Sequence, residues 1–251
     1  MSHDAQEGQY FNIIVINLDR DTERFNSVSK QISDFGLQFH RLSAINGASL
    51  PRGLLKRVKI GGRAANNFPG TFGCLTSHIK AWETSLTLEK DFTLILEDDI
   101  VINSSISSID SNFFSQNFDL YFANNRISSH FNQKSSPVTT YPFAEVAATR
   151  PSGISTPGGD GYFVSKSGAR KLLERINWAR LPRHVDQFLV SASLVPQHLD
   201  VIEKNPALAE GIKSMGSTMG EKPEISSVCI IPAIVQHIVN SKSSRISSDQ
   251  T

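Results

Sequence analysis

Three carboxylates in a row follow an apolar run in the stretch LILEDDI, residues 94–100. Neighbouring negative charges repel one another, so such an arrangement is stabilised when a cation lies among them. If strand alternation continues through the triplet, Glu97 and Asp99 share one face and Asp98 points elsewhere. Carboxylate oxygens suit Mg²⁺ or Mn²⁺ rather than zinc. The triplet is therefore a candidate site for a hard divalent cation; the alternative is a solvated turn at the end of a strand.

A divalent cation held by only one or two protein carboxylates usually completes its coordination shell with water and phosphate oxygens. Such a cation can hold a nucleoside diphosphate leaving group, because it neutralises the charge that develops as a phosphate–sugar bond breaks. The acidic triplet is thus compatible with nucleotide chemistry.

Strands and helices alternate in the predicted structure around the triplet. Residues 11–18 and 38–45 have the composition of buried strands, and the apolar spacing between them predicts a helix that ends at Gly36. Further elements are expected as helices over 70–88, 166–176 and 184–194, strands over 92–98, 118–123 and 161–165, and late strands within 228–239 broken by Pro232. A long loop region is expected over 124–160. This order predicts an α/β fold with a mainly parallel sheet flanked by helices.

In such sheets, ligands bind beyond the carboxyl ends of the strands. Asn17-Leu18-Asp19 and the acidic triplet both follow predicted strands directly. We therefore expect the acidic triplet to lie in a cleft at this edge of the sheet rather than in a turn on the open surface.

Composition limits the classes of protein to consider. The chain has 251 residues, 39% of them hydrophobic and 20% charged, with a formal net charge of +1, so nothing in it indicates nucleic-acid binding. Its start, MSHDAQEGQY, is polar, and no apolar run approaches the ~20 residues that span a bilayer. Cys74 and Cys229 have no metal-type spacing. We expect a cytoplasmic protein in a reducing compartment.

One interval has a strong local charge. No acidic residue occurs between Asp34 and Glu83, and PRGLLKRVKIGGR (51–63) mixes basic with apolar residues. This segment is a candidate for peripheral contact with an anionic membrane surface. A solvated face with a hydrophobic underside is the alternative.

Four blocks in a fixed order make the chain resemble glycosyltransferase family 25, whose bacterial members build lipopolysaccharide and lipooligosaccharide outer cores. The blocks are IIVINLDRDTERF (13–25), HRLSAINGASL (40–50), GTFGCLTSHIKAWE (70–83) and TLILEDDI (93–100). Weaker matches are GGDGYFVSKSGARKLL (158–173) and HVDQFL (184–189). The resemblance defines one domain over 10–240, followed by a polar tail over 241–251 that we expect to be mobile.

The resemblance implies a GT-A-like (Rossmann-like) fold, a UDP-sugar donor, Mn²⁺ or Mg²⁺ as cofactor and transfer with inversion. The triplet looks like a variant of the family's metal-binding Asp-x-Asp. Asp99 would then be a metal ligand, Glu97 would reach the ribose or a metal-bound water, and Asp98 would support them. The activity implied is hexose transfer, with β-galactose from UDP-galactose as first choice, onto a lipid-linked lipopolysaccharide or lipooligosaccharide core sugar at the inner membrane.

Other donor-binding candidates lie in the matching blocks. They are Asn17, Asp19, Arg20, Arg24, Ser77 and His78. An arginine where a strand meets its helix could pair with phosphate. Asp19 could instead cap the helix, Arg24 could be a surface residue, and His78 could be a packing histidine. Cys74 is interpreted as a small buried hydrophobe.

Inversion requires a general base that deprotonates the acceptor hydroxyl. Asp186 is the first candidate, since it begins a predicted helix whose N-terminus keeps a carboxylate ionised; helix capping is its alternative role. Asp160 and Glu145 are the other candidates. His237 is either a late metal ligand, as in other GT-A enzymes, or a core histidine.

Several rivals remain open. The donor could be UDP-glucose or UDP-N-acetylglucosamine, and the chain could be a non-catalytic sugar-binding module on the same scaffold. A metal-dependent phosphohydrolase would need more clustered His and Asp ligands. A relative acting on collagen hydroxylysine fits poorly with the cysteine content and the polar start.

Overall fold

A mixed β-sheet forms the centre of the molecule. The computed structural model describes residues 8–124, 126, 137–143, 146, 157–179, 181–182, 184–194 and 223–238. In this part of the chain the sheet has seven strands in the order β2-β1-β5-β9-β7-β10-β8. Their bounds are β1 Asn12–Asn17, β2 His40–Ser43, β5 Phe92–Glu97, β7 Leu120–Phe122, β8 Thr139–Pro142, β9 Gly161–Ser165 and β10 Ser227–Ile231.

Five of these strands run in one direction and β8 and β9 run in the other. β1 pairs in parallel with β2 and β5, and β10 pairs in parallel with β7, whereas β9 lies antiparallel between β5 and β7. The predicted α/β, GT-A-like fold is therefore confirmed. The carboxyl ends of β1, β2 and β5 meet at one edge of the sheet, as the prediction required.

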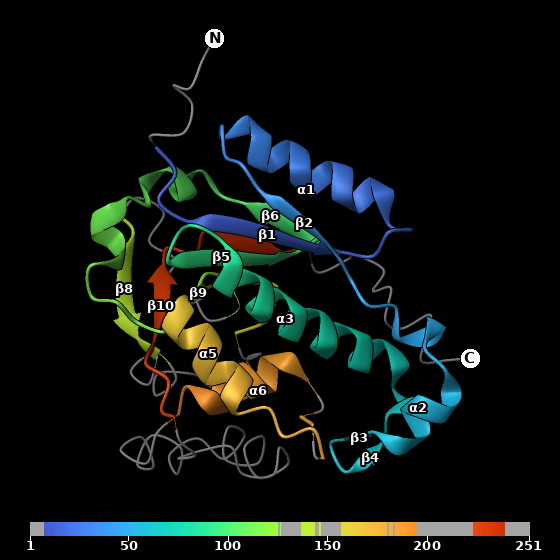
Figure 1. Ribbon diagram of the computed structural model, residues 1–251. Coiled ribbons are helices and arrows are strands. Elements are labelled where there is room, and N and C mark those ends of the chain that lie inside the picture. The colour runs from blue at the N-terminus through green and yellow to red at the C-terminus, as the bar shows by residue number, and fades with distance from the viewer. Residues whose placement is uncertain are drawn as a thin grey trace.

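Helices cover both faces of the sheet (Figure 1). α1 (Thr22–Asp34) lies on one face, and its Val28 and Ile32 pack against alternate residues of β1 and β5. The other face carries α3 (Pro69–Thr87), α5 (Lys166–Glu174) and α6 (Val185–Ala192). β1 and β5 are buried on both sides, which explains why their sequences are apolar almost throughout.

Shorter elements complete the described structure. Predictions missed α2 (Arg52–Arg57), the hairpin of β3 (Lys59–Ile60) and β4 (Arg63–Ala64), and β6 (Ile100–Ile102), which pairs with β11 (Val235–His237). The 3₁₀-helices are η1 Gly47–Ser49, η2 Ala65–Asn67, η3 Ser104–Ser108 and η4 Ser111–Phe114. Elements this short carry too little periodicity to be recognised in a sequence.

The predicted loop over 124–160 needs correction. β8 lies within this range and pairs with β10 at the edge of the sheet. It was missed because a strand of four residues is too short to show a clear alternation of polar and apolar side chains. Among the described residues, no helix combines the length and apolar character needed to cross a bilayer. The predicted tail, 241–251, and Glu145 lie outside the described residues.

Candidate donor-binding site

A pocket opens at the carboxyl edge of β1, β2 and β5. It holds about 620 Å³ of empty space, part of it open to solvent. The start of α1, the turn after β2, the first half of α3 and the acidic triplet form its walls. The lining residues are Ile16, Leu18, Arg20, Asp21, Arg24, Ala44, Ile45, Asn46, Gly47, Gly70, Cys74, Ser77, His78, Glu97, Asp98 and Asp99.

The acidic triplet divides between two helices. Asp98 and Asp99 lie 3.3 and 3.6 Å from the Arg24 guanidinium of α1, so this arginine offsets part of their repulsion. Glu97 instead contacts Cys74 and His78 of α3. The predicted shared face of Glu97 and Asp99 is therefore wrong, because β5 ends at Glu97 and strand alternation does not continue beyond it.

Burial affects the protonation of Asp98, the middle residue of the triplet. Desolvation raises the pKa of Asp98, and the hydrogen bond from Asn17 Nδ2 (2.6 Å) together with the Arg24 charge opposes that rise. Asn17 also accepts a 2.6 Å hydrogen bond from Arg41. Asn17 therefore supports the triplet from behind, and it is not among the lining residues.

The other predicted donor-binding residues are distributed unevenly around the pocket. Arg20 and Arg24 line it. Asp19 does not; its carboxylate accepts a hydrogen bond from Ser43 and lies 3.4 Å from Arg41. Helix α1 begins after Asp21, whose side chain makes no capping hydrogen bond.

Ser77 holds the turn after β2 against α3. Its hydroxyl accepts the Ile45 N–H at 2.8 Å and donates to the Gly73 carbonyl at 2.6 Å. Ser77 is 1% exposed, so it shapes the wall of the pocket through these two bonds.

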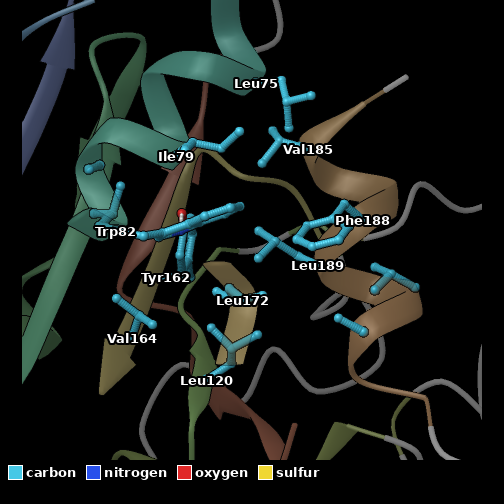
Figure 2. Packing of buried hydrophobic residues seen from close by; sticks show 14 of the residues in the cluster. Leu75, Ile79, Trp82, Leu120, Tyr162, Val164, Leu172, Val185, Phe188 and Leu189 are labelled. Carbon is cyan, nitrogen blue, oxygen red and sulfur yellow. Dashed lines mark hydrogen bonds between the residues drawn. The ribbon is translucent and has the colours of Figure 1, made fainter. Parts of the chain in front are cut away.

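His78 joins a buried chain of polar groups. Trp82 Nε1 donates to Tyr162 Oη at 2.8 Å, and that oxygen lies 2.9 Å from His78 Nδ1. Burial raises the pKa of Tyr162 well above its usual value, so the hydroxyl keeps its proton and donates it to Nδ1. The other ring nitrogen, His78 Nε2, lies 3.3 Å from Glu97 Oε1. Figure 2 shows Trp82 and Tyr162 packed where α3, β9 and α6 meet.

Asp186 lies in the first turn of α6 and contacts a different segment. Its Oδ1 accepts the Gly159 N–H at 2.6 Å, and its Oδ2 lies 3.6 Å from Arg126. Asp186 is not among the residues that line the pocket. A Cβ added at Gly159 would lie 3.2 Å from Asp186 Oδ1 and 3.3 Å from His78 Cε1. Asp186 and His78 therefore lie on either side of Gly159, and Asp186 is close to the pocket although it does not line it.

Asp160 and His237 form a second polar group at the same edge. Asp160 is 1% exposed, and its Oδ2 lies 3.2 Å from Arg126 Nε and 3.3 Å from His237 Nδ1. The backbone bond from Ile238 N to Asp99 O brings the end of β11 beside the triplet. His237 is half-buried among charged groups, so it is not the core histidine considered above.

Arg126 was missed because a lone arginine in a Ser- and Asn-rich stretch carries no pattern. Cys74 was interpreted as a packing residue, yet its thiol lies 3.6 Å from Glu97 in the pocket wall. No sequence signal marks Tyr162 as the partner of His78, because 84 positions separate them.

The charge of His237 should make the stability of the metal-free protein depend on pH. The Asp160 carboxylate, 3.3 Å away, raises the pKa of His237, and burial partly opposes this rise. The folded state then binds the proton more tightly, so this stabilisation is complete below the unfolded-state pKa of 6.5 and is lost as pH rises through the folded-state pKa. We expect His237→Gln to reduce this loss, measured by chemical denaturation across about pH 5.5–8.5.

The control for this measurement is His40→Gln, which removes an exposed histidine from β2. It should retain the wild-type dependence. An unchanged pH profile in His237→Gln would contradict the prediction.

Comparison with known proteins identifies the family. The protein-family model described as "Glycosyltransferase family 25 (LPS biosynthesis protein)" matches residues 11–189 of this chain. The chain therefore belongs to glycosyltransferase family 25.

Curated relatives named "Glycosyltransferase 25 family member" match part of the chain. Those from Aedes aegypti and Drosophila pseudoobscura pseudoobscura are 29% and 31% identical over 97 residues, and one from Anopheles gambiae is 31% identical over 99. Each match covers 36% of this chain and 16% of the relative. A solved structure, described as a glycosyltransferase involved in glycosylation of the major capsid of PBCV-1, aligns over 96% of this chain and 98% of its own, with 11% identity and a TM-score of 0.32.

Proposed function

We propose that this chain is an inverting, metal-dependent hexosyltransferase that uses a UDP-sugar. One observation carries the proposal: in a family 25 chain, the pocket at the carboxyl edge of the sheet has arginines at one wall and three carboxylates at another. Arg20 and Arg24 are suited to a diphosphate, since guanidinium groups bind phosphate oxygens in pairs. The neighbouring carboxylates supply the oxygen ligands that Mg²⁺ and Mn²⁺ prefer.

The residues around Asp99 fit a hard divalent cation. Asp99 is 7% exposed, and both Asp160 oxygens are buried without a well-formed hydrogen bond among the described residues. His237 lies next to Asp160 at the end of β11, beside Asp99. Asp99 is therefore the ligand in our proposal, and water and the phosphate oxygens of the donor would complete the coordination shell. Asp160 and His237 lie nearby, but among the described residues only Cys74, His78 and Glu97 bring three such donor atoms within 4.8 Å of one another. A bound Mn²⁺ or Mg²⁺ would neutralise charge on the leaving diphosphate.

Glu97 has a different role in this scheme than the sequence suggested. Its carboxylate is directed to Cys74 and His78, away from the Arg24 contact of Asp98 and Asp99. We assign Glu97 to donor positioning, together with His78, rather than to the ligands shared with Asp99.

Asp186 is the general base in this proposal. It would accept the proton of the acceptor hydroxyl as that oxygen attacks the anomeric carbon opposite the diphosphate; the bond from carbon to phosphate oxygen breaks and UDP leaves. Its side chain is 27% exposed, so an acceptor can reach it. The hydrogen bond from the Gly159 N–H fixes the direction of the Asp186 carboxylate.

A lipopolysaccharide or lipooligosaccharide core sugar is the acceptor we propose, in line with the family's description as lipopolysaccharide biosynthesis proteins. Galactose is our first choice for the transferred sugar. UDP-glucose and UDP-N-acetylglucosamine are the alternatives. The test is UDP release from these three donors, with and without Mn²⁺, in the presence of core oligosaccharides. Metal-dependent release that needs an acceptor supports the proposal, whereas no release from any donor contradicts it.

Contact with an anionic membrane surface through residues 51–63 is part of the same proposal. Lys56, Arg57 and Lys59 are exposed, and Leu54 in α2 is 47% exposed. Exposed Trp178 belongs to the segment whose Leu181 pairs with the β3–β4 hairpin. Basic side chains beside an exposed leucine and tryptophan have the composition of interfacial segments.

Neutralising three charges in this segment should weaken membrane binding. Each basic residue near an anionic surface contributes about 1 kcal/mol, so Lys56→Gln, Arg57→Gln and Lys59→Gln together should reduce binding to phosphatidylserine vesicles by ~100-fold at low salt. Co-sedimentation with the vesicles measures the bound fraction of each variant. The matched control replaces Lys30, Lys90 and Lys166 by Gln; equal binding by both triple variants would contradict the assignment.

A further inference from the structure

Three metal-binding side chains of different chemistry meet in the pocket wall. Cys74 and His78 are one helical turn apart on α3, and Glu97 ends β5 opposite them. One donor atom from each lies within 4.8 Å of the other two. The cluster is separate in chemistry from the carboxylates at Asp99, because it combines a thiol and an imidazole with a single carboxylate.

Two of the distances in the cluster match the edges of a tetrahedral zinc site. Cys74 Sγ lies 3.6 Å and His78 Nε2 3.3 Å from the same oxygen, Glu97 Oε1. A zinc ion with its usual bond lengths separates sulfur from oxygen by about 3.6 Å and nitrogen from oxygen by about 3.4 Å along the edges of its tetrahedron. Two of the three separations therefore match those of zinc ligands, and one donor atom from each residue lies within 4.8 Å of the other two.

The second ring nitrogen of His78 has a partner of its own, since Nδ1 lies 2.9 Å from Tyr162 Oη. For a cation to bind at Cys74 Sγ and His78 Nε2, the thiol proton would pass to solvent and His78 would carry its proton on Nδ1. The Tyr162 hydroxyl would then accept that N–H instead of donating to the ring. Zinc-bound histidines are commonly held through their second nitrogen in this way.

We propose that Cys74, His78 and Glu97 form a binding site for a thiophilic divalent cation of the zinc class, with its fourth position facing the pocket. All three residues line that pocket, so water or a ligand there can complete the coordination shell. Three protein ligands and one open position are typical of zinc sites that exchange a ligand. The proposal rests on this geometry and does not depend on glycosyl transfer.

Cobalt is the probe, because a thiolate bound to Co²⁺ gives a charge-transfer absorption in the near ultraviolet. We expect the metal-free wild-type chain to show this band with one equivalent of Co²⁺ and to lose it when Zn²⁺ is added. Cys74→Ser should abolish the band, and zinc affinity measured by calorimetry should fall by more than ~100-fold, beyond the loss that an outer-sphere partner causes. Glu97→Gln should weaken binding while the sulfur band persists at higher Co²⁺.

Two controls separate this site from others. Cys229→Ser removes the other thiol, in β10, and should keep the band, as should Asp99→Asn, which alters the hard-cation site. Circular dichroism of Cys74→Ser checks that the fold is intact. Absence of the band in the wild type, its persistence in Cys74→Ser, or its loss in Cys229→Ser would each overturn the proposal.

Discussion

Replacing Asp186 by asparagine should reduce turnover by about 10²–10⁴-fold, the contribution usual for a general base. The asparagine Oδ1 can still accept the Gly159 N–H, so the local structure is retained while the proton acceptor is lost. Donor affinity should stay close to the wild-type value, because Asp186 is not among the lining residues of the pocket. Steady-state kinetics and calorimetry with a UDP-sugar measure the two effects.

A second variant distinguishes a catalytic role of Asp186 from a structural role in holding Gly159. Asp186→Ala removes both the base and the partner of Gly159. If Asp186 only holds Gly159, the asparagine variant will behave like the wild type and only the alanine variant will lose activity. Asp34→Asn makes the same chemical change at an exposed position on α1 and should leave turnover unchanged.

Gly73→Ala should lower the free energy of unfolding by about 2–3 kcal/mol, the effect of overpacking a close contact. A Cβ at Gly73 would lie 2.3 Å from the Ile45 carbonyl oxygen and 2.7 Å from the Gly47 nitrogen. Both are backbone atoms, so α3 and the turn after β2 must move apart. Ile45 and Gly47 line the pocket, and nucleotide binding should weaken as well. Urea denaturation and calorimetry test the two parts.

Gly53→Ala is the matched control. Gly53 lies in α2, and a Cβ there would meet nothing within 4 Å. Alanine in a helix is more stable than glycine by roughly 0.5–1 kcal/mol, so this variant should be as stable as the wild type or more so. Equal destabilisation by both substitutions would contradict the close approach of α3 to the turn.

The parts of the fold that could be predicted are those with strong periodicity. β1 and β5 are continuous apolar runs, and α1 and α3 have helical spacing of their buried residues. Their order predicted the parallel pairing at the carboxyl edge, and with it the place of the pocket. The antiparallel direction of β9 could not be predicted, because a buried five-residue strand reads the same in either direction.

The site could be predicted only in part, because contacts between distant segments decide its chemistry. Arg24 and the acidic triplet were candidates, and the structure brings Arg24 together with Asp98 and Asp99. The direction of the Glu97 side chain toward α3 depends on where β5 ends. Arg126 becomes recognisable as a site residue only from its contacts with Asp160 and Asp186. Such contacts between distant segments cannot be predicted from the residues adjacent in sequence.

The most direct test of the account is the binding of UDP to metal-free protein by calorimetry, with and without Mn²⁺, for the wild type and Asp99→Asn. We expect Mn²⁺ to strengthen UDP binding to the wild type and Asp99→Asn to lose this gain, with a fall in Mn²⁺ affinity beyond the ~10–100-fold that loss of an outer-shell partner causes. Asp34→Asn should behave like the wild type. UDP binding that ignores Mn²⁺, or an Asp99→Asn variant that responds to Mn²⁺ as the wild type does, would contradict the cation-dependent donor site.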